Sequence, residues 1–486
     1  MIMSIITQIN LLKKRRTKIL ATLGPASSEP DQIRKLIKAG VNIFRQNMSH
    51  GDHSYHKETY ARIREIASDL DLPVGILADL CGPKIRTGKF KKGSIELKNN
   101  ESVIVTTRDV EGKPGLIPSQ YSSLADDVEP EDRILLADGT LELEVDSIDG
   151  TEISCTVIYG GTLGNHKGIN LPGVKVSAPS LTDKDKADAK LALELGVDFL
   201  ALSFVRSAED ILDLKKLIQS HDSDARIIAK IEKPEALDEA SAILDAADGI
   251  MVARGDLGVE LNPEQVPVAQ HQLIDLARRK FKPVIVATQM LESMIENARP
   301  TRAEVTDVAY AVTLGTDAIM LSGETAVGAF PVEAVKMMDR VARQTESYLW
   351  SHDGYSAKLP DSNSKIAMSV WDAVANSMAQ MAQDLKVHGV VVISQSGMSA
   401  ATMSSARPAA PVVAITNRPD ICRKMSMLWG VIPVLSENAG KSNPNVLARK
   451  VVLDEGLALV GEKILLVRGF HSDNALNTPS VTVITI

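Results

Sequence analysis

The stretches Arg226-Ile-Ile-Ala-Lys-Ile-Glu232 and Gly249-Ile-Met-Val-Ala-Arg-Gly-Asp256 decide the fold of this chain. Each is an apolar run that reaches charged residues at its end: Lys230 and Glu232 in the first, and Asp256 in the second. Short apolar, β-branched runs indicate buried strands. A cation and two carboxylates at neighbouring strand ends suit a divalent metal with a positive charge beside it, which serves phosphoryl transfer or enolate chemistry. A structural ion pair is the common alternative for one such pair, but it does not explain a recurring pattern.

The same kind of run recurs along the chain, and most of the intervals place apolar residues at the three-to-four spacing of a helix. Eight strands, each followed by a helix, predict a (β/α)8 barrel with its active site at the carboxyl ends of the strands. A doubly wound open sheet also fits, but it explains less well why so many strand ends are polar. The predicted strands are Thr17–Leu23, Asn42–Met48, Pro73–Leu80, Phe199–Phe204, Arg226–Glu232, Gly249–Gly255, Pro283–Met290 and Ala318–Glu324. The predicted helices are Asp31–Ala39, Ser54–Ser68, Asp185–Leu195, Pro234–Ala246, Pro263–Lys280, Arg302–Leu314 and Val332–Thr345. The strand ends carry Gly24, Asn47, Asp79, Ser203, Glu232, Asp256, Thr288 and Glu324.

A barrel of this kind needs roughly 250 residues, so a chain of 486 residues has room for more. We assign residues 17–82 and 181–349 to the barrel, and residues 1–16 to an N-terminal arm. Residues 83–180 contain alternating segments separated by Asp138-Gly139 and Asp149-Gly150, which predicts a small all-β domain. An insertion at the catalytic face is placed to act as a lid. The alternating segments are Ser102–Thr107, Arg133–Ala137, Leu141–Val145 and Glu152–Val157.

The third part, residues 350–486, predicts an α/β domain with an open, mainly parallel sheet. It begins with a helix over Lys365–Leu385 and alternates strands with helices to the end of the chain. The segment Ser394-Gln-Ser-Gly-Met-Ser399 lies between a strand and a helix, where N–H and O–H groups can bind a phosphate. An ordinary turn with a serine cap explains it equally well. The predicted strands are Val387–Ser394, Val412–Thr416, Val431–Val434, Lys463–Val467 and Val481–Ile486.

Composition excludes several classes of function. The net charge of −8 and the pI near 5.7 argue against a nucleic-acid surface, and Lys13-Lys14-Arg15-Arg16 is expected to be a solvated arm. No apolar segment reaches transmembrane length, and charges follow the N-terminal apolar stretch in the wrong order for a secretory signal. Three distant cysteines, Cys81, Cys155 and Cys422, indicate a reducing, cytoplasmic compartment without a disulfide framework or thiolate metal site.

Several long motifs follow one another along the chain: Thr17–Ser27, Arg45–His50, Asp79–Arg86, Lys167–Gly173, Lys230–Glu232, Met251–Gly258, Ala287–Met294 and Met320–Thr325. Such motifs in this order are highly specific, whereas a lone Lys-x-Glu would be weak. On these stretches the chain resembles the pyruvate kinase family over nearly its whole length. This resemblance implies transfer of the phosphoryl group of phosphoenolpyruvate to ADP, giving pyruvate and ATP, the last step of glycolysis.

The resemblance assigns catalytic roles. Glu232 and Asp256 are expected to hold Mg²⁺, with Mn²⁺ as an alternative, because two carboxylates leave positions for substrate oxygens and water. Lys230 is expected to stabilise the phosphoryl group in flight, and Arg45 to grip its oxygens. Thr288 is placed to relay a proton to enolpyruvate with the help of water. Substrate contacts are expected from Arg45, Ala253, Gly255, Asp256 and Thr288.

The resemblance also assigns the nucleotide and a monovalent cation. In the family, nucleotide contacts match Asn47, Met48, Ser49, His50, Arg86 and Lys167, the last of which lies in the lid. Members that require K⁺ hold it with groups that match Asn47, Ser49, Asp79 and the backbone oxygen of Leu80. Those members usually carry Glu where this chain has Lys84. We therefore expect the Lys84 ammonium to replace K⁺ and the enzyme to work without potassium, the alternative being that Lys84 points to solvent.

The C-terminal part carries the family's effector site, and family members are usually homotetramers. A sugar phosphate bound by Ser394, Ser396, Gly397 and Ser399 is one hypothesis, although Met398 and the loop Arg468–Ala475 depart from the family pattern. Effector identity and the existence of activation stay open. Two other functions were weighed: a metal-dependent lyase or aldolase acting on a pyruvate enolate, and a catalytically dead sensor. The lid and Lys167 argue against the lyase, and the presence of Lys230, Glu232, Asp256 and Thr288 argues against the sensor.

Overall fold

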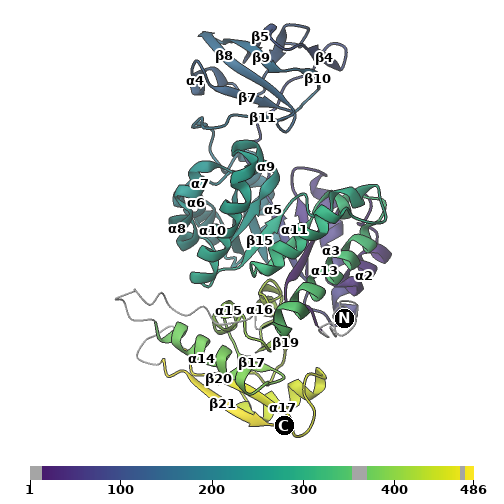
Figure 1. Cartoon of the computed structure of the whole chain (residues 1–486), viewed down its shortest axis with the longest axis vertical. Helices are drawn as coiled ribbons and strands as arrows, with labels where there is room; N and C mark the ends of the chain where they lie inside the picture. The colour runs from purple at the N-terminus through teal and green to yellow at the C-terminus, as the bar shows by residue number, and fades with distance from the viewer. Residues whose placement is uncertain (1–13, 353–368, 471–476) are drawn as a thin grey trace.

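The computed structural model describes residues 14–352, 369–470 and 477–486. Figure 1 shows three parts stacked along the long axis: a small β part at the top, a barrel in the middle and an α/β part at the bottom. The predicted N-terminal arm lies outside the described residues up to residue 13. The start of the helix predicted over Lys365–Leu385 and most of the loop Arg468–Ala475 lie outside them too.

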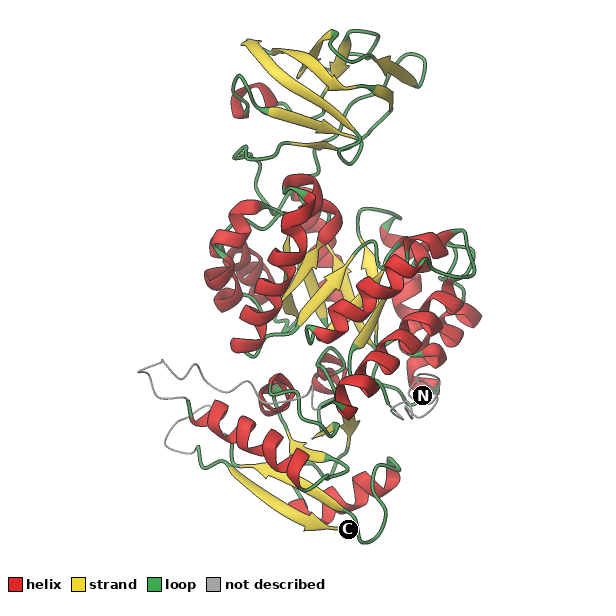
Figure 2. Cartoon of the chain, viewed as in Figure 1, coloured by secondary structure: helices red, strands yellow, loops and turns green. Residues whose placement is uncertain are grey.

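The middle part is a closed barrel of eight parallel strands in the order β1-β16-β15-β14-β13-β12-β3-β2. Figure 2 shows helices around these strands on the outside. Because side chains alternate along a strand, Ile228 of β13 packs inside the barrel while Ile227 and Ala229 pack against the helices. The strands are β1 (Lys18–Thr22), β2 (Ile43–Asn47), β3 (Gly75–Asp79), β12 (Phe199–Leu202), β13 (Arg226–Ile231), β14 (Gly249–Ala253), β15 (Val284–Ala287) and β16 (Ala318–Leu321).

All eight predicted barrel strands and all seven predicted helices are confirmed, with differences in detail. The predicted helix Pro234–Ala246 divides at Glu239 into two shorter helices. Two further helices, α6 after β12 and the short α12 after β16, were not predicted. The helices are α2 (Pro30–Ala39), α3 (His53–Asp69), α5 (Asp183–Leu195), α6 (Ala208–Ser220), α7 (Pro234–Asp238), α8 (Ala240–Ala246), α9 (Arg254–Glu260), α10 (Val266–Arg279), α11 (Arg302–Thr313), α12 (Gly323–Ala326) and α13 (Pro331–Ser351), with short 3₁₀ turns at Pro263–Gln265 and Glu292–Ile295.

A β domain is inserted between β3 and α5, as predicted. It holds a six-stranded sheet, β11-β7-β8-β9-β5-β6, and a two-stranded sheet of β10 and β4, around its own apolar core. The domain boundaries at residues 83 and 180 remain predictions. The elements are β4 (Ser94–Leu97), β5 (Ser102–Thr106), β6 (Leu116–Pro118), α4 (Leu124–Asp127), β7 (Arg133–Leu136), β8 (Leu141–Asp149), β9 (Glu152–Tyr159), β10 (Gly161–Gly164) and β11 (Ile169–Asn170).

The C-terminal part is an open five-stranded sheet in the order β19-β18-β17-β20-β21. All its pairings are parallel except that of β20 with β21, so the prediction of a mainly parallel sheet is confirmed. Its Met427 packs with the residues inside the barrel, so the two parts share a core. The elements are α14 (Val370–Asp384), β17 (Val390–Ile393), α15 (Met398–Ser405), β18 (Val412–Thr416), α16 (Pro419–Met425), β19 (Val431–Leu435), α17 (Pro444–Asp454), β20 (Lys463–Arg468) and β21 (Ser480–Thr485).

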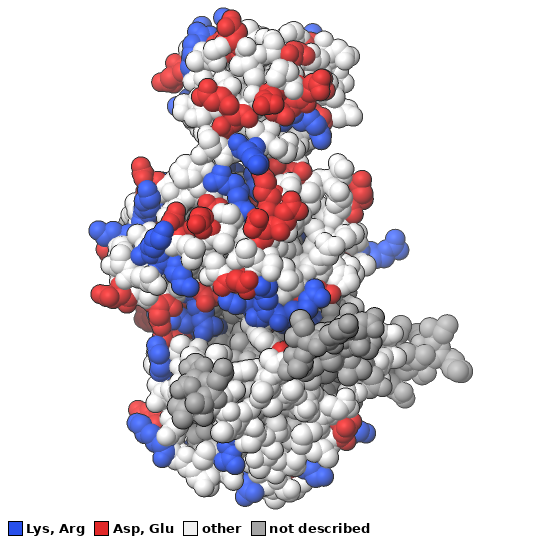
Figure 3. Space-filling view, turned by 90° about the vertical axis from the view of Figure 1, so that its left-hand side faces the viewer, with Lys and Arg blue, Asp and Glu red and all other residues white. Residues whose placement is uncertain are grey.

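The surface is charged but mixed. Figure 3 shows acidic and basic side chains interspersed on the β domain and the barrel, with Lys and Arg gathered where the barrel meets the C-terminal part. None of the described helices is both long enough and apolar enough to cross a bilayer.

Candidate active site

Lys230 is the centre of a buried polar cluster at the carboxyl end of the barrel. Its Nζ donates to Ser203 Oγ at 2.7 Å and pairs with Glu232 Oε1 at 2.8 Å and Asp79 Oδ1 at 3.4 Å. Since Lys230 shares the inward face of β13 with Ile228, strand alternation aims it into the mouth of the barrel. The predicted meeting of strand-end residues is therefore confirmed for these four side chains.

The charges of the cluster reinforce one another. Burial by itself would lower the pKa of Lys230, but Asp79 and Glu232 outweigh it and raise that pKa above its ordinary value. Burial would raise the pKa of Asp79, but Lys230 and Arg45 prevail and lower it. Burial raises the pKa of Glu232, and Asp256 adds to this effect against the pull of Lys230. At neutral pH the cluster thus holds a permanent cation beside ionised Asp79.

Arg45 enters the cluster from β2. Its Nε donates to Asp79 Oδ2 at 2.6 Å and its Nη1 donates to Thr22 Oγ1 at 3.1 Å. The Arg45 side chain is 11% exposed, so its fork lies near the surface of the site while Asp79, at 1%, lies beneath it. A guanidinium fixed in this way can offer its remaining N–H groups to phosphate oxygens.

The two predicted metal ligands fit a divalent cation. Glu232 Oε2 accepts from Phe204 N at 2.7 Å, while its buried Oε1 pairs with Lys230 Nζ at 2.8 Å. Asp256 stands close enough for its charge to raise the pKa of Glu232. Two neighbouring carboxylates suit a hard cation that keeps several other positions open. No group of three or more His, Cys, Asp or Glu suited to a metal occurs in the described part of the chain.

Thr288 sits just beyond β15 in a constrained turn. Its φ of 68° is unusual for a β-branched residue, and such strain concentrates at functional sites. Thr288 Oγ1 donates to Ala287 O at 2.6 Å and accepts from Gly255 N at 2.7 Å. Gly255 belongs to the first turn of α9, which begins directly after β14. To relay a proton, the Thr288 hydroxyl has to turn away from its own backbone.

Arg254 holds this turn, and sequence reasoning gave it no role. Its Nη2 donates to Thr288 O at 2.7 Å, and its Nη1 pairs with Asp307 at 2.7 Å. These contacts stabilise the strained backbone conformation of Thr288. The only local signal for Arg254 was its place in Met251–Gly258, because its partner Asp307 lies 53 residues away.

The predicted nucleotide residues fall in two places. Asn47, Met48, Ser49 and His50 form the turn after β2, where Ser49 N donates to Asn47 Oδ1 at 3.1 Å. Beside them lies a mainly apolar hollow of about 920 Å³ that Pro25 and Tyr55 also line. Arg86 and Lys167 lie on paired segments at the base of the β domain, since Thr87 N donates to Lys167 O at 2.8 Å. Burial and the charges of Lys84, Arg86 and Arg45 lower the pKa of His50.

Lys84 is exposed and lines a cleft of about 580 Å³ between the barrel and the β domain, together with Asp256, Asp138 and Lys233. No hydrogen bond or ion pair within the described ranges joins Lys84 Nζ to Asp79. Two of the residues predicted to hold a monovalent cation already have other partners. Leu80 O accepts from Ser203 Oγ at 2.7 Å, and Asp79 binds Arg45.

The predicted effector residues lie on the turn from β17 to α15. Ser394 is buried and its Oγ has no hydrogen-bond partner among the described residues, whereas Ser396 is exposed. Gly397 has a φ of 84°, which glycine adopts without strain, and Ser399 lies in the first turn of α15. Arg226 Nη2 donates to Ser396 O at 2.7 Å, a barrel contact that the sequence did not suggest.

Two further residues are structural. Glu324, the polar residue after β16, is fully buried and accepts from Leu291 N and Ser322 N, at 3.0 and 2.7 Å. Thr301 and Glu304 form a capping box at the start of α11. We assign neither Glu324 nor this capping box a role in the chemistry at Lys230.

A closed (β/α)8 barrel whose mouth holds a buried lysine, a fixed arginine and two metal-type acids defines a class: metal-assisted barrel enzymes that act on phosphorylated or enolate substrates. The family follows from comparison. The sequence model of the pyruvate kinase barrel domain matches residues 14–335, and that of the pyruvate kinase alpha/beta domain matches residues 372–484. The chain therefore belongs to the pyruvate kinase family, whose members are phosphotransferases.

Individual relatives agree with this assignment. The chain is 46% identical over 425 residues to pyruvate kinase 2 of Synechocystis sp., covering 87% of this chain and 71% of that one. It is 44% identical over 460 residues to pyruvate kinase of Geobacillus stearothermophilus, covering 94% and 78%. A crystal structure of a pyruvate kinase from Cryptosporidium parvum superposes with a TM-score of 0.89 at 36% identity, covering 97% and 98%. These matches give no support to the lyase or aldolase alternative.

Proposed function

We propose that this protein transfers the phosphoryl group of phosphoenolpyruvate to ADP, giving pyruvate and ATP. The observation that carries the proposal is the Lys230 cluster, in which one buried ammonium lies within 3.4 Å of Asp79, Ser203 and Glu232 at the mouth of the barrel. Little covalent chemistry is needed in phosphoryl transfer, so positioning and charge do most of the catalysis. A permanent cation, fixed by buried partners, supplies both.

The chain's own residues then take the following parts. Arg45, held by Asp79 and Thr22, binds oxygens of the phosphoryl group. Lys230 neutralises charge on that group as it moves. The N-terminus of α9, from Ala253 to Asp256, faces the substrate carboxylate. Thr288 passes a proton, with water, to the methylene carbon of enolpyruvate on its way to pyruvate.

Glu232 and Asp256 would hold Mg²⁺, or Mn²⁺ in its place, between them. The bound cation supplies charge neutralisation and orients substrate oxygens. Pyruvate kinases generally need Mg²⁺ and usually K⁺. For this chain we propose that Lys84 replaces K⁺: its ammonium lines the same cleft as Asp256, and its charge reaches His50 in the turn that holds Asn47 and Ser49. Asp79 already binds Arg45, and Leu80 O already accepts a hydrogen bond from Ser203 Oγ. Both are therefore less available to a potassium ion, which supports the same proposal.

The nucleotide is proposed to lie between the turn at Asn47–His50 and the base of the β domain. The apolar hollow beside Tyr55 suits a purine ring, and Arg86 and Lys167 suit phosphates. Because Lys167 belongs to the inserted domain, closure of that domain as a lid would bring its ammonium over the nucleotide.

Three further properties are proposed from family membership. The chain forms a homotetramer, works in the cytoplasm, and responds to a sugar phosphate at the turn Ser394–Ser399. The exposed Ser396 and the nearby guanidinium of Arg226 support an anion at that turn.

The function is tested by a pyruvate-formation assay. Purified protein with Mg²⁺, phosphoenolpyruvate and ADP should form pyruvate, and omission of ADP should abolish the product. Pyruvate formation that is independent of ADP would favour a lyase or phosphatase instead. Titration of sugar phosphates at subsaturating phosphoenolpyruvate tests the effector, and no leftward shift with any of them would count against it.

A further inference from the structure

The groups around Lys230 come from three strands that are neighbours in the barrel. Asp79 ends β3, Ser203 follows β12, and Lys230 lies in β13, in the barrel order β13-β12-β3. The strands are four to six residues long and almost wholly buried. Because each residue advances a strand by only about 3.3 Å, these strands are short. A shift at the amino end of such a strand should therefore also move its carboxyl end.

The amino ends of the same three strands meet at Asp198, the residue before β12. Asp198 is 1% exposed, and its Oδ2 accepts from Ile76 N of β3 at 2.8 Å. Its backbone oxygen accepts from Arg226 N, the first residue of β13, at 3.1 Å. Arg64 Nη2 of α3 also donates to Oδ2, at 2.8 Å. One buried carboxylate residue therefore joins the base of all three strands.

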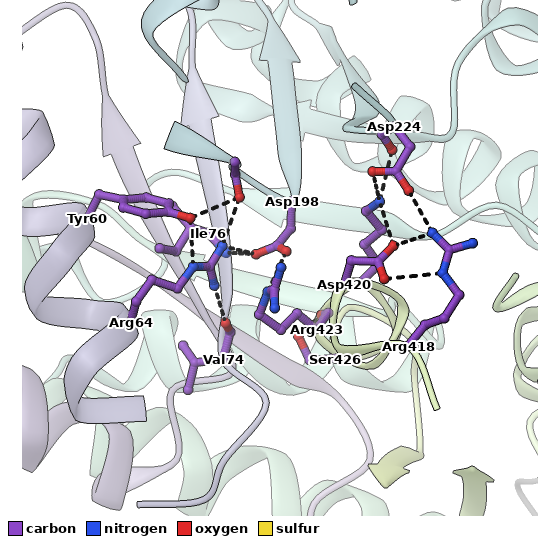
Figure 4. A network of polar contacts seen from close by, with 12 residues as sticks. Tyr60, Arg64, Val74, Ile76, Asp198, Asp224, Arg418, Asp420, Arg423 and Ser426 are labelled. Atoms are coloured by element: carbon purple, nitrogen blue, oxygen red, sulfur yellow. Dashed lines mark hydrogen bonds and ion pairs between the residues drawn. The ribbon is translucent and has the colours of Figure 1, made fainter. Parts of the chain in front are cut away.

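Helix α16 of the C-terminal part contacts this base through two consecutive residues. Arg423 Nε donates to Asp198 Oδ1 at 2.8 Å. Lys424, which is 2% exposed, pairs with Asp224 Oδ1 at 2.6 Å and donates to Asp224 O at 3.0 Å, two residues before β13. Figure 4 shows Asp198 between Arg64 and Arg423, with Arg418 and Asp420 beside Asp224. The helix thus binds β12 and β13 at the ends opposite to the catalytic groups.

We propose that Arg423 and Lys424 are positioning residues for phosphoryl transfer. By fixing Asp198 and Asp224, they set the places of β3, β12 and β13, and through these strands the places of Asp79, Ser203 and Lys230. The proposal rests on the proposed function. Its energetic basis is that misplacing a catalytic group by about 1 Å can cost roughly a hundredfold in rate.

The competing explanation is that these ion pairs only hold two domains together. The molecule contains a matched contact that separates the two explanations. Arg407 of the C-terminal part pairs with Asp317 at 2.9 Å, and both side chains are 4% exposed. Asp317 precedes β16, which ends at Leu321 and contributes no group to the Lys230 cluster. A role in domain packing alone predicts similar effects for Arg423 and Arg407.

The test compares Arg423→Gln with Arg407→Gln and with the conservative Arg423→Lys. A displacement of a few tenths of an ångström in Arg423→Gln should lower kcat by about tenfold, with the KM for phosphoenolpyruvate nearly unchanged. Arg423→Lys should recover most of the lost kcat. Arg407→Gln should lower the melting temperature and leave kcat near the wild-type value. If Arg407→Gln does not fold, Lys14→Gln, which removes an exposed ion pair between the N-terminal arm and the C-terminal part, to Glu455 at 2.7 Å, takes its place.

A wild-type kcat in Arg423→Gln would overturn the proposal, and so would an equal loss of kcat in the control. Hydrogen exchange supplies a readout that does not depend on activity. The amide of Phe204, which donates to Glu232, should exchange faster in Arg423→Gln and not in the control. An inactive wild-type protein would contradict the proposed function alone, whereas an active wild type with unchanged exchange and kcat in Arg423→Gln would contradict this inference alone.

Discussion

Two buried lysines at opposite ends of the barrel have opposite electrostatics. Lys230, near the carboxyl end of β13, is 9% exposed and contacts Asp79 and Glu232. Lys18, the first residue of β1 at the other end, is 6% exposed, and its Nζ donates to Val431 O at 2.6 Å. The acids raise the pKa of Lys230, while burial, together with the charges of Arg15 and Arg16, lowers that of Lys18 to about 7.

The difference shows what each end of the barrel does. At the carboxyl end of the strands the fold retains a full positive charge by burying Asp79 and Glu232 as ion-pair partners of Lys230. At the base, the carboxylate of Asp198 is bound by three donors and Lys18 loses its proton readily. The fold thus keeps Lys230 charged with two paired carboxylates, whereas the hydrogen-bond partner of Lys18 is a backbone oxygen.

The largest expected effect belongs to Lys230→Met. Loss of the cation should lower kcat by about 10³ to 10⁵, the range measured for a single cation that stabilises transferred phosphoryl groups. Steady-state kinetics with phosphoenolpyruvate and ADP measures this. Lys233→Met is the matched control, because Lys233 is also buried and paired, to Glu260 at 2.7 Å, but lies outside the cluster. A Lys230→Met enzyme within tenfold of wild-type kcat would remove Lys230 from the mechanism.

Lys18→Met should change stability instead of catalysis. The folded pKa of Lys18, about 7, is below the unfolded value of about 10.4. The unfolded chain therefore binds more protons between these values, and the free energy of unfolding of the wild type should rise with pH across this window. At pH 6 the penalty is full, on the order of 4 kcal/mol, and Lys18→Met removes it.

Thermal unfolding of the wild type and Lys18→Met at pH 6, 8 and 10 checks this. The variant should be the more stable at pH 6, and the gap should close towards pH 10. Lys14→Met, at an exposed lysine of the same end, is the control. A gap that is constant with pH would show that Lys18 does not titrate in the folded protein near pH 7.

Lys84→Glu should create a requirement for potassium. The wild type should work at full rate in tetramethylammonium buffer. The variant should be roughly a hundredfold slower in that buffer than in KCl. This factor lies within the ~4 kcal/mol by which two unit charges 4 Å apart interact at an effective dielectric of 20. Rates at constant ionic strength measure both. Lys84→Gln, which removes the charge without reversing it, separates charge from shape. Activation of the wild type a hundredfold by KCl would refute the role of Lys84.

The smallest effect is expected for Lys167→Ala. If closure of the β domain brings Lys167 to the nucleotide, its loss should raise the KM for ADP by about tenfold, the value of a hydrogen bond to a charged group, with a smaller change in kcat. Lys89→Ala, at another exposed lysine of the same domain, should leave both constants unchanged. Equal effects of the two substitutions would show that Lys167 makes no specific contact.

The meeting of Lys230, Glu232 and Asp79 could be predicted because strand ends can be read locally. Lys230, Glu232 and Asp79 each close an apolar run, and the barrel topology brings such ends together. Helix α6 was missed although Ser207 and Asp210 form its capping box and Ile211, Leu214 and Ile218 its buried face, so the signal was present. The helix predicted over Pro234–Ala246 breaks at Glu239, where no Gly or Pro indicates a break.

Other features could not be predicted from local pattern. The Arg254 contact with Asp307 spans 53 residues, and the Arg423 contact with Asp198 spans 225. Both depend on how loops and domains pack, which periodicity does not encode. The positive φ of Thr288 also has no sequence signal, because a β-branched residue normally avoids it.

The central claim is that the Lys230 cluster catalyses transfer of the phosphoryl group from phosphoenolpyruvate to ADP. Phosphorus NMR of the reaction mixture tests this without any coupling enzyme. With the wild type, the signal of phosphoenolpyruvate should disappear as the γ-phosphorus signal of ATP grows by the same amount, and with Lys230→Met both signals should stay nearly constant over the same time. Phosphorus that appears as inorganic phosphate while ADP is unchanged, or transfer by Lys230→Met at the wild-type rate, would contradict the account.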